Sequence, residues 1–584
     1  MSRLGWAIGA SLAAICTATA ASADPRAAIE GVQDEELRER IEGAIGEVEG
    51  PPGSRFEARR RANAAAESAI ALLRSEGYYG YTVEPDVTEG DNARPLVRID
   101  PGPRFAIQSP DVAFVGAAPA ADAADAARAS IGLTIGEPGR APDIVEAEGR
   151  IVSSLQARGY ADASVEPRQV VVDHADRSVR PTFRVATGEL VRLNGLEFEQ
   201  LGRTNRRWIE SLVPWRSGEV YEPRDVAELE RRLLDTGVYD SVTVSLAPGS
   251  RPDGLRPVVV SLADRPRGTL EALASISTSE GYSIEGRLTR YNRFGRADTL
   301  TTLLRLGTLD SRVEVDLSVP HFRRPQRTLH LGAAAFRTET DAFDETGLRA
   351  SADLTQRWGR TTYFTYGGSV EGLQTIEFGT ARNFFAVTGL GAFNLDRSND
   401  PLDPKRGYRL EGRVEPTALT GDSSLAFLRT MAGGSIYFPF GEAANTVIAT
   451  RLRLGVILGG EIPDVPASRR FYAGGGGSVR GYEYQAIGPR APDGRPFGGL
   501  SLLETSVELR RSNIWKRLGG VVFVDAGSVS EQEFPGGDEL KASIGFGVRY
   551  DLGFGPIRAD LAVPLNKRDG EAAFQVYLSI GQAF

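Results

Sequence analysis

The 584-residue sequence is poor in the side chains that most enzymes and metal proteins depend on, with one cysteine, two methionines and three histidines. The histidines, His174, His321 and His330, lie far apart and lack H-E-x-x-H spacing, so no metal site is predicted. No G-x-S-x-G motif is present, so a lipase-type serine nucleophile is not predicted. The glycine run 474–477 is not followed by Lys and then Ser or Thr, so it does not have the pattern of a phosphate-binding loop. We therefore expect no cofactor, no metal and no enzymatic activity.

Positive charge and long hydrophobic runs are also scarce. Lys and Arg number 68 against 77 Asp and Glu, so the net charge is 68 − 77 = −9, which argues against a nucleic-acid partner. After the N-terminal region no run reaches 18 apolar residues, so no membrane-spanning helix is expected. A membrane β-barrel remains compatible, because its strands are polar at every second residue.

The N-terminus has the features of a secretory signal peptide. Arg3 supplies the positive region, residues 4–20 are mostly apolar, and Ala21-Ser22-Ala23 forms a cleavage site before Asp24. Residues 1–23 are therefore expected to be removed on export. Cys16 would leave with them, so the mature chain could form no disulfide and no thiolate metal site.

The first half contains three copies of one module. Each copy has a helix-like run followed by Gly and an aromatic residue, and the three glycines Gly77, Gly159 and Gly237 are spaced by 82 and 78 residues. This period predicts three modules, at residues 24–103, 104–188 and 189–266.

The third copy shows the expected order of elements within a module. A strand-like run at 191–198 precedes a helix with Val226, Leu229 and Leu233 on one face, and 241–246 and 257–262 suggest a hairpin. The predicted order is β-α-α-β-β, an α+β fold with helices on one face of a three-stranded sheet. An open sheet edge can accept a strand from an unfolded client, although such modules can also be plain spacers.

The second half, residues 267–584, consists of alternating strands. About sixteen segments of roughly ten residues alternate apolar and polar side chains, as at Val313, Val315, Leu317 and Val319. The pattern predicts an all-β, 16-stranded antiparallel transmembrane barrel. A soluble sandwich is the alternative, but the uniform strand length and the expected export favour the membrane.

The end strands of this barrel would meet at a seam. The first strand, about 269–278, is rich in Ala, Ser and Thr and should pack weakly across strands. The last is expected to close the barrel, with a possible kink at Gly581. Its apolar face is predicted to carry Phe574, Val576, Leu578, Ile580 and Phe584.

A long insertion at 459–499 separates two strong strands and contains Val479-Arg480-Gly481-Tyr482. Loops of this length in barrels are usually functional. In the strands that follow, Glu508 and Asp525 lie opposite apolar faces and would point into the lumen. A loop folded inward would pair Arg480 with one or both carboxylates and be held there. A catalytic acid–base role for the two carboxylates is a less economical interpretation.

These motifs resemble the BamA/TamA superfamily of outer-membrane assembly proteins. The resemblance rests on Val-Arg-Gly-Tyr in a sixth long loop, followed by strands containing Ser-Val-Glu and Phe-Val-Asp-Ala-Gly. The modules resemble the periplasmic POTRA domains of that superfamily. Three modules before sixteen strands, together with the segment 545–565, fit its TamA branch best. The resemblance implies a latch of Arg480 with Glu508 and Asp525.

The resemblance also implies a function and partners. POTRA modules in the periplasm would capture unfolded clients of the autotransporter type, and the outer-membrane barrel would insert them through a lateral opening between its first and last strands into lipid. A TamB-like protein anchored in the inner membrane is the implied partner. The alternatives are a dedicated two-partner-secretion-type pore, a general BamA-like insertase, or a passive channel.

Overall fold

The structure is a computed structural model that describes residues 24–90, 93–249, 254–277, 281–359, 361–441, 445–536, 539–552, 556–580, 582 and 584. The chain divides into two compact units. The first comprises residues 1–195, 215–226 and 246–258; the second comprises 196–214, 227–245 and 259–584. The predicted signal peptide, with Ala21 and Ala23, lies outside the described residues, and Asp24 begins the first short strand.

The first module packs two helices on a three-stranded sheet of order β2-β5-β4. The side chain of Asp34 caps the first helix by accepting from the N–H groups of Glu36 and Leu37, as an N-terminal Asp is expected to do. Leu37, Ile41 and Leu73 are buried between the helices and the sheet. The elements are β1 (Asp24–Pro25), β2 (Ala28–Glu30), α1 (Glu35–Ile45), β3 (Glu47–Val48), α2 (Arg55–Ser75), β4 (Thr82–Val87) and β5 (Pro95–Asp100).

The second module also packs two helices on a sheet, but its sheet has four strands. Its last strand, β9, lies between β7, which is parallel to it, and β8, which is antiparallel to it. Ile151, Leu155, Val179 and Phe183 are completely buried between its longer helix and the sheet. The elements are β6 (Ala106–Ile107), β7 (Asp111–Val115), α3 (Ala121–Ala129), α4 (Ala141–Gln156), β8 (Ser164–Asp173) and β9 (Ser178–Ala186).

The third module has the sheet order β10-β12-β11. Val226, Leu229 and Leu233 are buried on one face of its main helix, as the spacing predicted. Gly237 follows that helix with φ +70°, a conformation that favours glycine. The elements are β10 (Arg192–Gln200), α5 (Arg206–Glu210), α6 (Pro223–Leu234), β11 (Tyr239–Leu246) and β12 (Leu255–Asp264). The predicted β-α-α-β-β order is confirmed in all three modules, and the short strands β1, β3 and β6 are additions to it.

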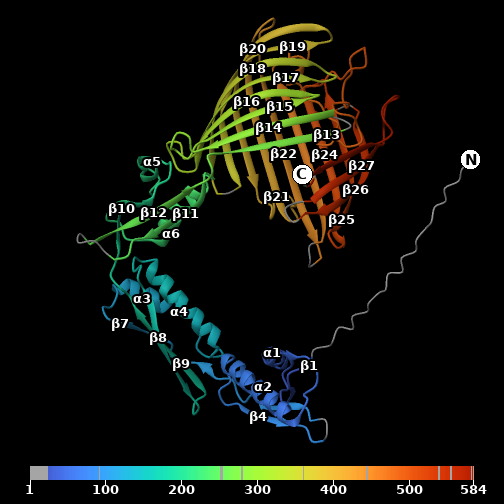
Figure 1. Ribbon diagram of the computed structural model, residues 1–584. Helices are drawn as coiled ribbons and strands as arrows, with labels where there is room; N and C mark the ends of the chain where they lie inside the picture. The colour runs from blue at the N-terminus through green and yellow to red at the C-terminus, as the bar shows by residue number, and fades with distance from the viewer. Residues whose placement is uncertain are drawn as a thin grey trace, which may run out of the picture. The chain divides into compact units, whose positions relative to one another are not determined.

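Sixteen antiparallel strands follow, paired in sequence order from β13 to β28 and curved into a barrel wall (Figure 1). The predicted strand number is therefore confirmed. The strands are β13 (Gly268–Ser277), β14 (Gly281–Tyr291), β15 (Thr299–Gly307), β16 (Asp310–Val319), β17 (Arg327–Glu339), β18 (Asp344–Arg357), β19 (Thr362–Glu377), β20 (Thr380–Asp396), β21 (Gly407–Gly421), β22 (Leu425–Phe440), β23 (Thr446–Leu458), β24 (Ser501–Trp515), β25 (Leu518–Ser530), β26 (Lys541–Asp551), β27 (Pro556–Pro564) and β28 (Gln575–Ile580).

Alternation along these strands sorts the side chains between the outer face and the lumen. On β24, Val507 and Leu509 are about half exposed, whereas Ser506, Glu508 and Arg510 are buried. A barrel with an apolar outer face and a polar interior is the form that spans membranes. No helix among the described residues is long and apolar enough to cross a membrane.

Within the second unit, part of the third module contacts the barrel at two turns. Asn292, after β14, donates from Nδ2 to Thr204 Oγ1 at 2.7 Å. His321, after β16, lies with Nε2 2.9 Å from the carbonyl oxygen of Arg232. These contacts place the turns after β14 and β16 at the module end of the barrel.

Candidate functional site

The loop between β23 and β24 is folded into the barrel and supplies half of the buried residues of a hydrophobic cluster that it forms with the inner wall. Val479 is completely buried, and Tyr482 and Phe471 are nearly so. They pack in one cluster with inward-facing side chains of β20 and β25, among them Phe384 and Val529. The only helical turn of the loop is η1 (Ala467–Arg469). Burial of this apolar surface favours the inward position of the loop.

Arg480 is the centre of the site, and its side chain is 2 % exposed. Its Nε donates to Asp525 Oδ2 at 2.7 Å and its Nη2 to Asp525 Oδ1 at 2.9 Å, a bidentate pair. Its Nη1 lies 2.7 Å from Glu508 Oε1 and 3.2 Å from Asp560 Oδ2. The structure thus brings Arg480 to both carboxylates named from the sequence, and to a third.

Each of these carboxylates has a second partner on the barrel wall. Arg510 Nε donates to Glu508 at 2.7 Å, Ser506 Oγ donates to Asp525 at 2.6 Å, and Arg549 pairs with Asp560. Buried carboxylates require such compensation, since an unpaired charge in this environment is costly. The result is one network of buried charges across β24, β25, β26 and β27.

An aromatic ring also contacts the side chain of Arg480. Its guanidinium carbon lies 3.4 Å from the ring centroid of Phe523, which adds a cation–π contact. The ring occupies space that Gly545 leaves open, because a Cβ at that position would lie 2.2 Å from Phe523 Cζ. Gly547 does the same for Asp560, whose Oδ1 would be 2.0 Å from an added Cβ. Both glycines lie in the segment 545–565 that supported the resemblance, but the sequence pattern did not indicate this role.

The neighbours of Arg480 fix the loop to the last strands. Gly481 has φ +94° and donates its N–H to the hydroxyl of Tyr577 on β28 at 3.0 Å. The hydroxyl of Tyr482 lies 3.0 Å from the carbonyl oxygen of Ala542 and 2.8 Å from Asn566 Oδ1. All four residues of the predicted motif therefore contact the wall, and Tyr577 was not anticipated.

A second anchor, which sequence reasoning missed, holds the start of the loop on the opposite wall. The side chain of Arg470 is 1 % exposed and makes a bidentate contact with Glu377, at 2.5 and 3.0 Å. Arg469 pairs with Glu371, which also accepts from Arg349. Glu371 and Glu377 alternate with apolar residues on β19, which is the signal that would have found them.

The last strand differs in part from its prediction. Val576 and Leu578 lie on the outer face, 42 % and 73 % exposed, and Phe574 just before the strand is 56 % exposed. Ile580 ends the strand, its side chain is not among those described, and Gly581 lies outside the described residues.

Phe584 corrects that prediction, because it is in the lumen rather than on the outer face. Its ring stacks on Tyr437, and the guanidinium carbons of Arg451 and Arg510 lie 5.0 Å from its centroid. Two cation–π contacts and a stacked ring give the aromatic side chain a better environment here than strict strand alternation assumed.

The two ends of the sheet, β13 and β28, are joined by no backbone ladder among their described residues. Every other neighbouring pair is hydrogen-bonded in sequence order. The site therefore combines a loop fixed by buried charges with a sheet whose two end strands are not paired with each other among the described residues.

Comparison with known proteins identifies the family of this barrel. The Omp85 superfamily domain matches residues 292–584, just over half of the chain. The chain belongs to the Omp85 superfamily.

Its relatives carry two kinds of name. It is 24 % identical over 468 residues to "Outer membrane protein assembly factor BamA" of Neorickettsia risticii, covering 74 % of this chain and 60 % of the relative. It is 26 % identical over 331 residues to "Sorting and assembly machinery component 50 homolog" of Xenopus tropicalis, covering 52 % of this chain and 67 % of the relative. The chain thus spans only about 60 % of the BamA relative, and the relatives do not single out the TamA branch.

The fold is similar to a solved structure of this superfamily. The crystal structure of BamA from Haemophilus ducreyi lacking POTRA domains 1–3 matches with a TM-score of 0.70 at 18 % identity, covering 81 % of this chain and 99 % of that one. The three N-terminal sheets are POTRA-like, and the sixteen strands form a BamA-like barrel. The barrel is an outer-membrane barrel with its modules in the periplasm. The turns after β14 and β16 therefore lie on the periplasmic side.

Proposed function

We propose that this protein is a non-enzymatic insertase that assembles other β-barrel proteins into the outer membrane. The observation that carries the proposal is a sheet whose end strands, β13 and β28, show no pairing with each other over their described residues, found in a chain of the Omp85 superfamily. An edge strand with free N–H and C=O groups is a template for another strand. Unfolded outer-membrane proteins are substrates with the matching chemistry.

In this mechanism β13 offers its free edge to a client strand. The client adds strand by strand, so that its backbone groups are paired as they enter the lipid, where unpaired groups are costly. The buried network around Arg480 keeps the wall beside the seam, β24–β27, in one piece while the seam opens. Folding of the client then releases it sideways into the bilayer.

The modules supply the first contact with the client. In each module the last strand in sequence is central in the sheet and the other strands lie beside it, as in the order β2-β5-β4. Strand addition at such an edge would hold a client in extended form before insertion.

The lateral opening is tested by cross-linking the seam. Ala272 is exposed on β13, and Val576 and Leu578 face outward on β28. The variants Ala272→Cys/Val576→Cys and Ala272→Cys/Leu578→Cys cover two registers, in a chain whose only native cysteine is Cys16. Oxidation should stop insertion of a purified client into liposomes, and reduction should restore it. Full activity of a completely cross-linked seam would overturn the proposal.

A matched pair controls for cross-linking itself. Ala333 and Ala350 lie directly opposite each other on β17 and β18, both on the outer face. Ala333→Cys/Ala350→Cys joins two strands that are already paired. This variant should insert clients equally well when oxidised and when reduced.

We further propose the finer assignment that the three modules and the barrel act in the manner of TamA. The clients would then be autotransporter-type proteins, and a TamB-like inner-membrane protein would dock on the modules. Three modules before the barrel support this choice. Depletion in cells should lower autotransporters and a few complex barrels in the outer-membrane proteome. A general collapse of outer-membrane proteins would instead assign the role of the main insertase.

A further inference from the structure

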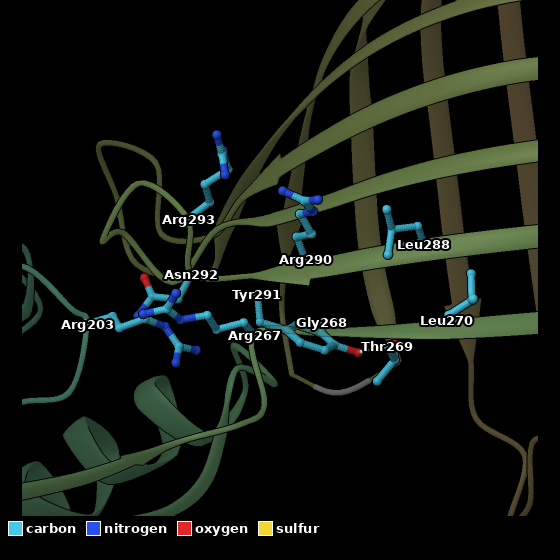
Figure 2. A pocket seen from close by; sticks show the side chains of 10 residues that line it. All are labelled: Arg203, Arg267, Gly268, Thr269, Leu270, Leu288, Arg290, Tyr291, Asn292 and Arg293. Carbon is cyan, nitrogen blue, oxygen red and sulfur yellow. Dashed lines mark hydrogen bonds between the residues drawn. The ribbon is translucent and has the colours of Figure 1, made fainter.

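A cleft of about 640 Å³ lies at the start of the barrel, where β13 and β14 begin and end at the periplasmic side. Figure 2 shows its walls, made by the two strands, the turn after β14 and Arg203 of the third module. All of these belong to the second compact unit. The volume falls within the range of small-molecule sites, about 300–1,000 Å³.

The charge of the cleft is strongly positive. Four arginines line it, Arg203, Arg267, Arg290 and Arg293, and no carboxylate does. Arg203 approaches Asp264, with Nη1 3.7 Å from Oδ2. Arg267, Arg290 and Arg293 form no ion pair within the part of the chain that the structure describes. A pocket that is lined by arginines and by no carboxylate is complementary to an anion.

The one acidic residue of the adjoining turn does not neutralise these arginines. Asp298 is completely buried and accepts from the backbone N–H groups of Arg293 and Phe294, at 3.0 and 2.9 Å. Its carboxylate is therefore engaged by the backbone of the turn and does not pair with the guanidinium groups of the cleft.

The other side of the cleft is apolar. Gly268 pairs with Arg290 and Leu270 with Leu288, so these four residues share one face of the sheet. It is the outer face, because Leu270 is 78 % exposed whereas Thr289, on the other side of β14, is buried. Figure 2 shows Leu270, Leu288 and Arg290 on the same side of the strands. A lipid-facing apolar surface thus passes into a cationic one within a few residues.

The arginines lie at the depth of the lipid headgroups. Phe294, in the same turn, is 60 % exposed, and Trp358 and Trp515 at other periplasmic turns are 58 % and 68 % exposed. Exposed aromatic residues in outer-membrane barrels mark the membrane–water interface. Acyl chains therefore reach the two leucines from one side, and phosphate groups reach the arginines from the other.

We propose that this cleft binds an anionic phospholipid of the periplasmic leaflet. One acyl chain lies along Leu270 and Leu288, and the phosphate accepts from the guanidinium groups of Arg290 and Arg293, with Arg267 adding charge. Planar guanidinium groups match phosphate geometry. Lipopolysaccharide does not fit, because the arginines face the periplasmic side. This site does not depend on the insertase function, since it concerns binding of a bilayer component.

The test is native mass spectrometry of the full chain in detergent, titrated with dioleoyl phosphatidylglycerol or dioleoyl phosphatidylcholine. The native chain should bind one phosphatidylglycerol about tenfold or more tightly than phosphatidylcholine, because each arginine attracts the anionic headgroup. Arg267→Gln/Arg290→Gln/Arg293→Gln should lose this preference. The corresponding triple lysine variant, which keeps the charge, should retain most of it.

A control variant removes the same charge elsewhere on the periplasmic end. Arg323→Gln/Arg324→Gln/Arg517→Gln changes exposed arginines in other turns and should leave the preference intact. Heat-modified gel migration shows that each variant is a folded barrel. Equal affinity for the two lipids, an equal loss in the control, tighter binding of lipopolysaccharide, or inorganic phosphate binding as tightly as phosphatidylglycerol would each overturn the proposal.

Discussion

The barrel contains two groups of arginines that differ in burial and in the partners of their charge. Arg480 is buried against three carboxylates and an aromatic ring, while Arg267, Arg290 and Arg293 lie exposed at the first strands with no ion pair among the described residues. A buried guanidinium must bring its counter-ions with it, because desolvation is costly, whereas an exposed one is compensated by water or by a ligand. The same residue type therefore fixes a wall in one place and leaves charge available in another.

Removing the buried cation should have the largest effect. Arg480→Ala leaves Glu508, Asp525 and Asp560 facing one another without it, and we expect a loss of about 3–5 kcal/mol in the free energy of unfolding. Chemical unfolding in detergent measures that loss, and trypsin sensitivity of residues 459–499 reports release of the loop. Client insertion should fall in parallel.

Arg495, in the same loop, provides the matched control. Its pair with Asp493 is about half exposed on both sides, so Arg495→Ala should change little. Direct pairing is tested by the exchange Arg480→Asp/Asp525→Arg. If the exchange recovers none of the loss seen for Arg480→Asp alone, the pair does not act through its charge.

The space under Arg480 should be the next most sensitive feature. Gly545→Ala forces a methyl group against Phe523, and we expect a cost of about 1–3 kcal/mol from overpacking. Gly372→Ala on β19 is the matched control, since nothing lies within 4 Å of an added Cβ there. If the two variants had the same unfolding midpoint, the ring of Phe523 would not be fixed in its position next to Gly545.

His321 tests a group that is buried but neutral. Burial lowers the pKa of this imidazole, although its contact with the carbonyl oxygen of Arg232 acts the other way. Its Nδ1 accepts from the N–H of Gln326 at 3.0 Å, which requires the neutral ring.

The sign of the pH effect follows from that pKa. Because the folded pKa lies below the ordinary value of 6.5, the stabilisation is present above pH 6.5 and is lost as the pH falls through the folded pKa. We expect the free energy of unfolding to fall by about 1 kcal/mol from this contact between pH 8 and pH 5. His321→Phe should remove that part of the pH dependence, and an unchanged slope in this variant would contradict the assignment.

The smallest effect on stability is expected at the exposed arginines. Arg290→Gln removes a cation that leaves no buried partner behind, so the free energy of unfolding should change by less than about 0.5 kcal/mol. A destabilisation comparable to that of Arg480→Ala would erase the distinction between the two groups. Unfolding curves for both variants, recorded in one detergent, provide the comparison.

Local patterns were enough to predict the elements of the fold. Alternation such as that of Val313 to Val319 predicted strands, and the spacing of Val226, Leu229 and Leu233 predicted a helix face, because each depends on residues a few positions apart. The pairing of Arg480 with Glu508 and Asp525 was also within reach, since both carboxylates follow the loop on strands whose faces could be assigned. The module boundaries and the latch role remain predictions.

Contacts between distant strands could not be predicted in the same way. Asp560 and Phe523 join the network because the register sets Arg510 opposite Val521, Gly547 and Asp560 in successive strands, and Glu508 opposite Phe523 and Gly545. The lumen position of Phe584 depends on Arg451, Arg510 and Tyr437 from three other strands.

The sequence by itself determined which segments are strands, which face of each is apolar, and that a glycine-rich loop carries a cation toward two acids. Only the tertiary structure decided which acids share that cation, where the chain's last aromatic ring lies, and that arginines of the third module, of the segment before β13, and of β14 and its turn gather around one cleft. The reason is physical. Alternation is a property of one strand, whereas register and curvature arise when the sixteen strands pair and bring side chains more than a hundred residues apart into contact, as with Tyr437 and Phe584.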